Sequence, residues 1–211
     1  MSESYQTASR EGRGIYEEKK SIFYSYIAPI ETEEEALEFI ELVRLERDNM
    51  RHVCYAYINR TGNVVRFSDD GEPQGTAGMP ILEVLRREEL VGVVCAVARF
   101  FGGVLLGAGG LVRAYGKAAK LALDDAGKST FVRYGVFNLS FDYTYLSKIR
   151  HELSGMKIPE EACEFGEKVT LTLFATPEEE VKIREKLADI TSGRAIFEKI
   201  SEKFAPERKS N

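Results

Sequence analysis

The chain has 211 residues, which is long enough for two domains that each bury a core. Its hydrophobic content of 44% and its charged content of 30% are typical of a soluble globular protein. The formal net charge of -5 argues against wholesale coating of nucleic acid, although it leaves room for a local basic patch.

The sequence shows no sign of secretion, membrane insertion or a disulfide framework. Its first residues contain no apolar run of the kind that signal peptides need. The apolar segment 90–112 is interrupted by Arg99 and by several glycines, so we expect two soluble elements there and no membrane partner. Cys54, Cys95 and Cys163 are far apart in apolar stretches and are expected to be core thiols. A cytoplasmic protein with reduced cysteines follows from these features.

The predicted elements before residue 90 are a strand, an amphipathic helix, a hairpin and a short helix. Thr32 followed by Glu35 is a capping box that starts the first helix. Pro80 lies near the first turn of the second helix, where proline is tolerated. The corresponding ranges are 19–30, 31–50, 52–68 and 80–89.

A buried strand over 91–101 and a glycine-rich loop running into a helix over 102–127 complete the first half. A domain boundary is predicted near 124–130, which divides the chain into domains 1–128 and 129–205 with a frayed tail over 206–211. The elements after the boundary follow the order β-α-β-β-α-β of a ferredoxin-like domain. Their ranges are 133–143, 144–155, 160–176 (two strands), 176–190 and 193–204, with Thr176 as a helix cap.

The stretch RFSDDGEPQGTAGMP, residues 66–80, admits three interpretations. Asp69 and Asp70 are weak candidates for holding a divalent cation, because hard cations prefer several oxygen ligands. Aspartate followed by glycine is also ordinary turn chemistry. The third interpretation is a loop that a protein partner reads, comprising Asp69, Asp70, Glu72, Gly75 and Thr76. Thr76 is expected to cap the helix that follows.

A second glycine-rich segment is basic, since no acidic residue lies between Glu89 and Asp124. Three of its cations recur at i, i+4 and i+7 and so share one helix face. Two glycines open the same helix and leave backbone N–H groups accessible to an anion. This pattern predicts an anion- or nucleic-acid-binding site, against the alternative of an ordinary solvated helix face. Its residues are Arg99, Gly109, Gly110, Arg113, Lys117 and Lys120.

No catalytic residue or cofactor is predicted. His52 and His151 are the two histidines, and the sequence carries no nucleophile signature, zinc signature or nucleotide-binding fingerprint. His52 begins a predicted strand from which it can approach the acidic loop.

Two segments read together, FSDDGEPQGTAGMPILEVL and VVCAVARFFGGVLLGAGGLVRAYGKAA, resemble the signature region of the IMPACT family, in particular its bacterial YigZ-type members. The resemblance spans residues 10–205. It implies an α+β protein with a ribosomal-protein-like N-terminal α/β domain, in which helices cover one side of a four-stranded sheet, and a C-terminal ferredoxin-like domain. It also implies kinship in fold with domains four and five of elongation factor G. Eukaryotic members of the family act in translational control, and the resemblance implies no catalytic residues.

Three functions therefore stay open. The first is a non-enzymatic module that binds RNA or the ribosome in translation-linked regulation. The second is a protein-binding regulatory module that uses the acidic loop. The third is a small metal-dependent enzyme acting on a phosphate compound. The oligomeric state is left open.

Overall fold

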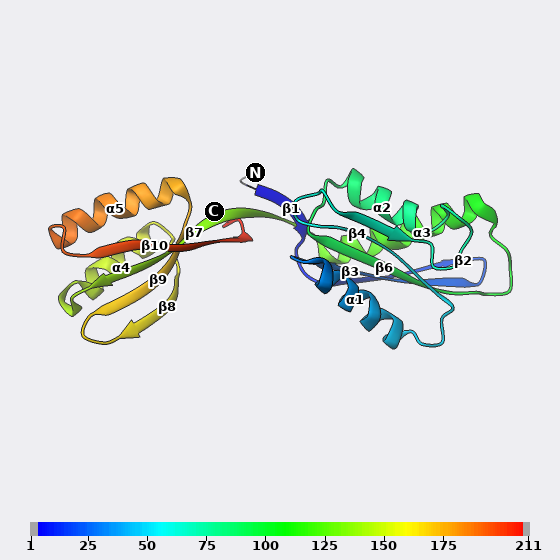
Figure 1. Ribbon diagram of the computed structural model, residues 1–211, viewed down its shortest axis with the longest axis horizontal. Helices are drawn as coiled ribbons and strands as arrows, with labels where there is room; N and C mark the ends of the chain where they lie inside the picture. Colours follow the sequence, from blue (N-terminus) through cyan, green and yellow to red (C-terminus); the bar gives the residue numbers. More distant parts are fainter. Residues whose placement is uncertain (1–3, 209–211) are drawn as a thin grey trace. The chain divides into compact units, whose positions relative to one another are not determined.

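The computed structural model describes residues 4–208, which fold into two compact units (Figure 1). The first contains the described chain through Phe131 together with 206–208, and the second is Val132–Ala205. Strand β7 (Lys128–Phe141) begins in the first unit and continues into the second, across the predicted boundary at 128. The fold class is α+β with two domains, as predicted.

The first unit contains a five-stranded antiparallel sheet in the order β2-β3-β6-β4-β5. These strands are β2 (Gly12–Glu18), β3 (Ser21–Pro29), β4 (His52–Ile58), β5 (Val65–Ser68) and β6 (Val93–Phe100). A further strand, β1 (Ser4–Ala8), pairs with β7. The helices of this unit are α1 (Glu33–Glu46), α2 (Gly78–Arg87) and α3 (Gly107–Ala126).

The sheet has five strands, and helices cover both of its sides. The expectation of a four-stranded sheet with helices on one side is therefore wrong. Along β6, Val93, Cys95 and Val97 belong to the core beneath α2 and α3. The alternate residues, Val94, Ala96 and Ala98, pack on the side of α1. A central strand that is apolar at every position from Val93 to Ala98 needs cover on both faces, and α1 supplies the second one. Figure 1 shows α1 on one side of the sheet and α2 and α3 on the other.

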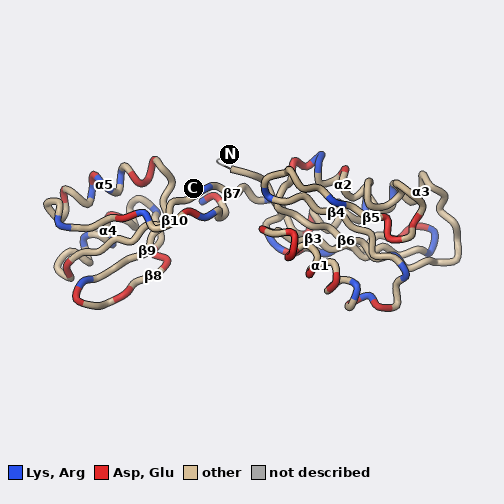
Figure 2. The backbone as a smooth tube through the Cα atoms, in the orientation of Figure 1, with Lys and Arg blue, Asp and Glu red and all other residues tan. Residues whose placement is uncertain are grey.

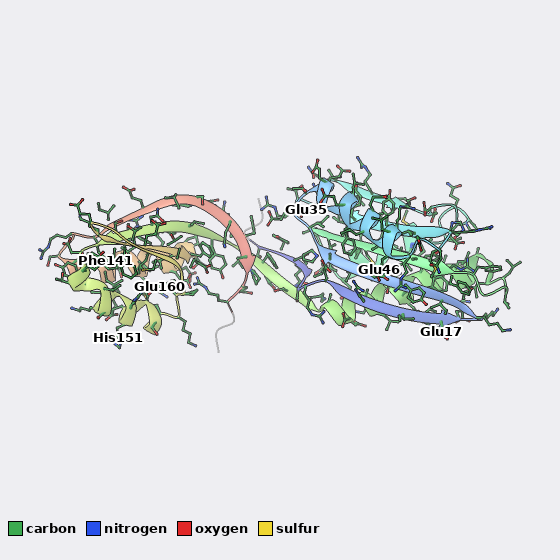
Figure 3. The ribbon with its side chains drawn as sticks, turned by 90° about the horizontal axis from the view of Figure 1, so that it is seen from below. Glu17, Glu35, Glu46, Phe141, His151 and Glu160 are labelled. Atoms are coloured by element: carbon green, nitrogen blue, oxygen red, sulfur yellow. The ribbon has the colours of Figure 1, made fainter. Side chains whose placement is uncertain are left out.

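Helix α1 presents an acidic surface to solvent. Thr32 caps it by accepting the N–H of Glu35, as predicted, but the Glu35 carboxylate accepts the N–H of Glu31 instead of closing the capping box on Thr32. Figure 2 shows the acidic positions at the start of the helix, where negative charge suits the helix dipole. In Figure 3, Glu35 and Glu46 mark its two ends.

Helix α3 packs unusually closely on β2. A Cβ atom at Gly12 would overlap the carbonyl oxygen of Ala122, and one at Gly14 would lie 2.8 Å from the Ala122 nitrogen. On the helix, Gly12 faces Ala122 and Ala126, and Gly14 faces Leu121 and Ala122. Strand β2 was not predicted, because glycine disfavours strands in general and here serves a close backbone approach.

The second unit confirms the ferredoxin-like prediction. Its sheet has the order β10-β7-β9-β8, with the antiparallel pairs β7–β9 and β8–β9, and the Thr176–Glu179 capping box starts α5. Strand β10 extends to Pro206, and the N–H of Glu207 donates to the Thr130 carbonyl at 2.8 Å. These two residues of the predicted frayed tail are therefore held, whereas 209–211 lie outside the described residues. The remaining elements are α4 (Leu146–Gly155), β8 (Glu160–Phe165), β9 (Val169–Ala175), α5 (Pro177–Thr191) and β10 (Ile196–Pro206).

We expect Gly12→Ala to lower the free energy of unfolding by about 1–3 kcal/mol, because the added methyl group pushes α3 away from β2. Gly116→Ala is the matched control within α3, since a Cβ there meets no atom within 4 Å. It should raise the free energy of unfolding by about 0.5–1 kcal/mol through helix propensity. Urea-induced unfolding followed by circular dichroism measures both changes. Equal effects of the two substitutions would contradict the close-packing argument.

Candidate functional site

The loop between β5 and α2 uses its first carboxylate as an internal helix cap. Asp69 Oδ1 accepts the N–H groups of Ala77 (3.0 Å) and Gly78 (2.9 Å), and its Oδ2 accepts the N–H of Gly75 (2.8 Å). These donors lie at the start of α2, where an anion is favoured by the free N–H groups and the helix dipole. The side chain of Thr76 instead donates to the Pro73 carbonyl at 2.6 Å, so the prediction that Thr76 caps α2 is wrong.

The second carboxylate, Asp70, ties the loop to α1 and β4. Its two oxygens each accept a hydrogen bond from Arg44 at 3.1 Å, and Oδ2 also accepts the N–H of Val53 at 2.7 Å. Partial burial opposes ionisation of Asp70, but the hydrogen bonds from Arg44 and Val53 outweigh it and hold the pKa of Asp70 below its usual value.

The third carboxylate, Glu72, belongs to a buried polar network. It accepts from Arg99 Nη1 at 2.7 Å and from the hydroxyl of Tyr115 at 2.9 Å. The side chains of Arg99 and Glu72 are only 8% and 5% exposed. Burial, with Cys54 and Glu72 nearby, raises the pKa of Tyr115 well above its usual value, so the hydroxyl stays protonated and donates. The network joins the loop, β6 and α3.

All three carboxylates of the acidic loop are thus engaged inside the protein. Within residues 4–208, no three His, Cys, Asp or Glu side chains come together in a way that suits a metal ion. The exposed part of the loop comprises Gly71, Pro73, Gln74 and Gly75. A partner approaching this loop meets backbone, Pro73 and the amide of Gln74 rather than a cluster of open carboxylates.

The predicted basic stripe on α3 is divided by its ion pairs. Arg113 and Lys117 are exposed, and neither forms an ion pair with another described residue. Lys117 lies over the ring of Tyr16, with its Nζ 3.3 Å from the hydroxyl. Lys120 is neutralised by Glu88 at 2.7 Å and Asp124 at 2.9 Å. Gly109 and Gly110 lie in the first turn of α3, whose N-terminus has no side-chain cap.

Arg113, Lys117 and Lys120 line a groove between α2 and α3 with a volume of about 550 Å³, which we call the α2–α3 groove. Arg87 lies in the same groove and is exposed. The sequence pattern along α3 could not identify it as a site residue, because Arg87 belongs to α2. Glu83 and Glu88 are the acidic residues of the lining. Hydrogen bonds from Lys120 and Lys128 lower the pKa of Glu88 to about 2, so that carboxylate is already neutralised by its neighbours.

Arg99 lies elsewhere, in a second cleft of about 710 Å³ that we call the β6–α3 cleft. It is formed by the start of β4, the end of β6 and the start of α3, and it shares no lining residue with the α2–α3 groove. Arg51 and His52 also line it, and neither was assigned to a site from the sequence. The ring of His52 contacts the acidic loop through Nδ1, 2.5 Å from the Asp70 carbonyl oxygen, as its position in the sequence suggested.

The remaining sequence expectations concern other parts of the chain. His151 lies on the exposed side of α4, in the second unit (Figure 3). Cys54 and Cys95 are buried free thiols. No helix in the described part of the chain is long and apolar enough to cross a membrane.

Comparison with known proteins finds relatives along most of the chain. Residues 19–123 match the Impact N-terminal domain, and residues 139–194 match a domain of unknown function, DUF1949. The IMPACT family member YvyE of Bacillus subtilis (strain 168) is 35% identical over 196 residues, which are 92% of this chain and 90% of the relative. The IMPACT family member YigZ of Escherichia coli (strain K12) is 36% identical over 146 residues, or 68% of each chain.

The fold also matches a solved structure. A crystal structure described as that of an hypothetical protein is 30% identical, with a TM-score of 0.63, and the match covers 95% of this chain and 99% of that one.

We expect Asp70→Asn to cost about 1.5–3 kcal/mol at neutral pH, because it removes the charge that Arg44 and the Val53 N–H recognise. The folded-state pKa of Asp70 lies below the unfolded value of about 3.9. Its contribution is therefore complete above that value and is lost as the pH falls through the folded-state pKa. Unfolding free energies of wild type and variant, measured from neutral pH downwards, should converge in acid.

Glu41→Gln is the control, because Glu41 contacts the same arginine but is 69% exposed. It should change the free energy of unfolding by less than about 0.5 kcal/mol. A wild-type advantage over Asp70→Asn that stays constant down to acid pH would contradict the assignment.

Proposed function

The chain belongs to the IMPACT family, and from this premise we propose that its first unit is a non-enzymatic module that binds RNA or the ribosome in translation-linked regulation. Membership of the family supports a regulatory, non-catalytic role. The α2–α3 groove is the proposed contact with the phosphate backbone.

One observation carries the proposal. Arg87, Arg113 and Lys117 are exposed around a single groove, and no acidic side chain among the described residues forms an ion pair with them. Three cations that keep their charge available, on two neighbouring helices, suit a chain of phosphates better than a single small anion. Lys120 adds little to this surface because Glu88 and Asp124 already neutralise it.

The local charge differs in sign from the whole molecule. The net charge of -5 repels a polyanion at long range, so binding has to depend on short-range contacts in the groove. With three phosphate contacts to single-stranded RNA, the logarithm of the association constant should fall with the logarithm of the salt concentration at a slope of about -2. The proposal is therefore one of modest, salt-sensitive affinity.

The two other hypotheses find less support in the site. A protein-binding role of the acidic loop rested on open carboxylates, yet Asp69, Asp70 and Glu72 all direct their oxygens to donors inside the protein. The same bonds occupy Asp69 and Asp70, which were the candidate ligands of a metal-dependent enzyme.

The test is binding of the full chain to purified bacterial ribosomes and to labelled single-stranded RNA of mixed sequence, over a series of salt concentrations. Arg113→Glu/Lys117→Glu should weaken RNA binding by at least about tenfold and flatten the salt slope from about -2 to about -0.7, the value for one remaining phosphate contact. Fluorescence anisotropy for the RNA and sedimentation for ribosomes give the two readouts.

Lys168→Glu/Lys182→Glu makes the same change in net charge at exposed positions of the second unit and should leave RNA binding within about twofold of wild type. Equal losses for the two double variants would show that only net charge matters and would remove the groove from the proposal. Recovery from cells of a protein partner that survives nuclease treatment, without ribosomal RNA, would favour the protein-binding alternative.

A further inference from the structure

The β6–α3 cleft has the size and the chemistry of a ligand site that the RNA proposal does not use. Its volume of about 710 Å³ lies within the usual range for small-molecule pockets. Its walls combine cations, exposed aromatic rings and the first turn of a 20-residue helix. All of these belong to the first unit.

Arg99 is a buried cation in the wall of the cleft, and its hydrogen bonds within the protein are incomplete. Its side chain is 92% buried, since only 8% is exposed. Nη1 donates to Glu72 at 2.7 Å and Nη2 reaches Ser21 Oγ at the long distance of 3.4 Å, while Nε has no hydrogen-bond partner among residues 4–208. A guanidinium has five N–H donors, and a buried donor without an acceptor costs free energy. Arg99 lines the cleft, and because the unpaired Nε is itself buried, a ligand there meets the positive charge of Arg99 rather than this donor.

The start of α3 is a second feature of the cleft. Helix α2 in the same unit has its N-terminal N–H groups filled by the Asp69 carboxylate, whereas α3 begins at Gly107 with no side-chain cap. Gly107 and Ala108 line the cleft and are exposed. Free N–H groups and the positive end of a helix dipole favour a bound phosphate.

The side chains around these two features also favour an anion. Arg51 is exposed on the wall formed by the start of β4. His52 lies directly opposite Arg99 in the β4–β6 pairing, and its Nδ1 donates to the Asp70 carbonyl, so Nε2 of the neutral ring is an acceptor and adds no contact to an anion. Glu72 is the acidic residue of the lining, and Arg99 and Tyr115 already occupy it.

An aromatic surface completes the cleft. Phe100 and Phe101 are 48% and 51% exposed, which is unusual for phenylalanine. The guanidinium of Arg99 lies 5.4 Å from the centre of the Phe101 ring, and Phe101 lines the cleft. An aromatic ring backed by arginine is a platform on which a nucleobase stacks.

We propose that the β6–α3 cleft binds one nucleoside monophosphate unit, with its phosphate at the start of α3 near Arg51 and its base stacked on Phe101. The inference uses residues that the α2–α3 groove lacks, so failure of RNA binding by the groove leaves it intact. The same unit can come from a free nucleotide or from the phosphorylated 5′ end of an RNA.

The experiment is isothermal titration of the full chain with AMP, adenosine and inorganic phosphate. AMP should bind at least about tenfold more tightly than either part alone, because the cleft offers both a stacking surface and an anion site. Phe101→Ala should weaken AMP by about tenfold and leave phosphate unchanged, whereas Arg51→Ala should weaken both AMP and phosphate.

Phe165→Ala and Lys182→Ala are the matched controls, since both residues are exposed in the second unit. Neither should change AMP binding by more than about twofold. Circular dichroism verifies that each variant is folded, and Arg51 and Phe101 are exposed enough for their truncation to spare the core.

Competition identifies the source of the unit. Displacement of AMP by a 5′-phosphorylated RNA oligonucleotide, but not by its 5′-hydroxyl form, supports an RNA end as the ligand; displacement by neither supports a free nucleotide. Absence of AMP binding at millimolar concentration, or AMP binding that is insensitive to both Arg51→Ala and Phe101→Ala, overturns the proposal.

Discussion

The first unit depends on a buried ion pair between Glu72 and Arg99, to which Tyr115 adds a hydrogen bond. The pair joins three segments that are far apart in the sequence: the loop after β5, the end of β6 and the middle of α3. A buried ion pair is stable only when its remaining donors and acceptors find partners. Glu72 meets this condition through Tyr115, whereas Arg99 does not meet it fully, because its Nε lacks an acceptor. The network therefore serves both as a structural link and as one wall of the β6–α3 cleft.

The acidic loop illustrates how a charged sequence can be structural. Each of its carboxylates satisfies backbone or side-chain donors: Asp69 caps α2, Asp70 binds Arg44, and Glu72 binds Arg99. The loop therefore adds no carboxylate to the α2–α3 groove, whose charged lining consists of four cations together with Glu83 and Glu88. The overall acidity of the protein is carried in part by α1, on the opposite face of the sheet.

Helices α2 and α3 differ in how their N-termini are satisfied, and this difference organises the two candidate surfaces. The N-terminal N–H groups of α2 donate to the carboxylate of Asp69, whereas α3 begins at the exposed Gly107 and has no side-chain cap. Along α3, the N-terminal turn faces the β6–α3 cleft, and Arg113 and Lys117 further along line the α2–α3 groove. The two proposed anion-binding surfaces, one lined by exposed aromatic rings and the other by exposed cations, thus use a single helix.

The sequence by itself determined the α+β class, the ferredoxin-like order of the second unit and most helices, because hydrophobic periodicity and caps such as Thr32 and Thr176 are local signals. It also identified Arg113 and Lys117 as neighbours on one helix face, since their spacing follows from helix geometry alone. Tertiary structure alone decided that α1 covers the second face of the sheet and that glycine-rich β2 is a strand, because both depend on what packs against them. Tertiary structure likewise decided which charged side chains are open to a ligand. Asp69, Arg99 and Lys120 are each engaged by partners from other segments, and no spacing in the sequence predicts those contacts.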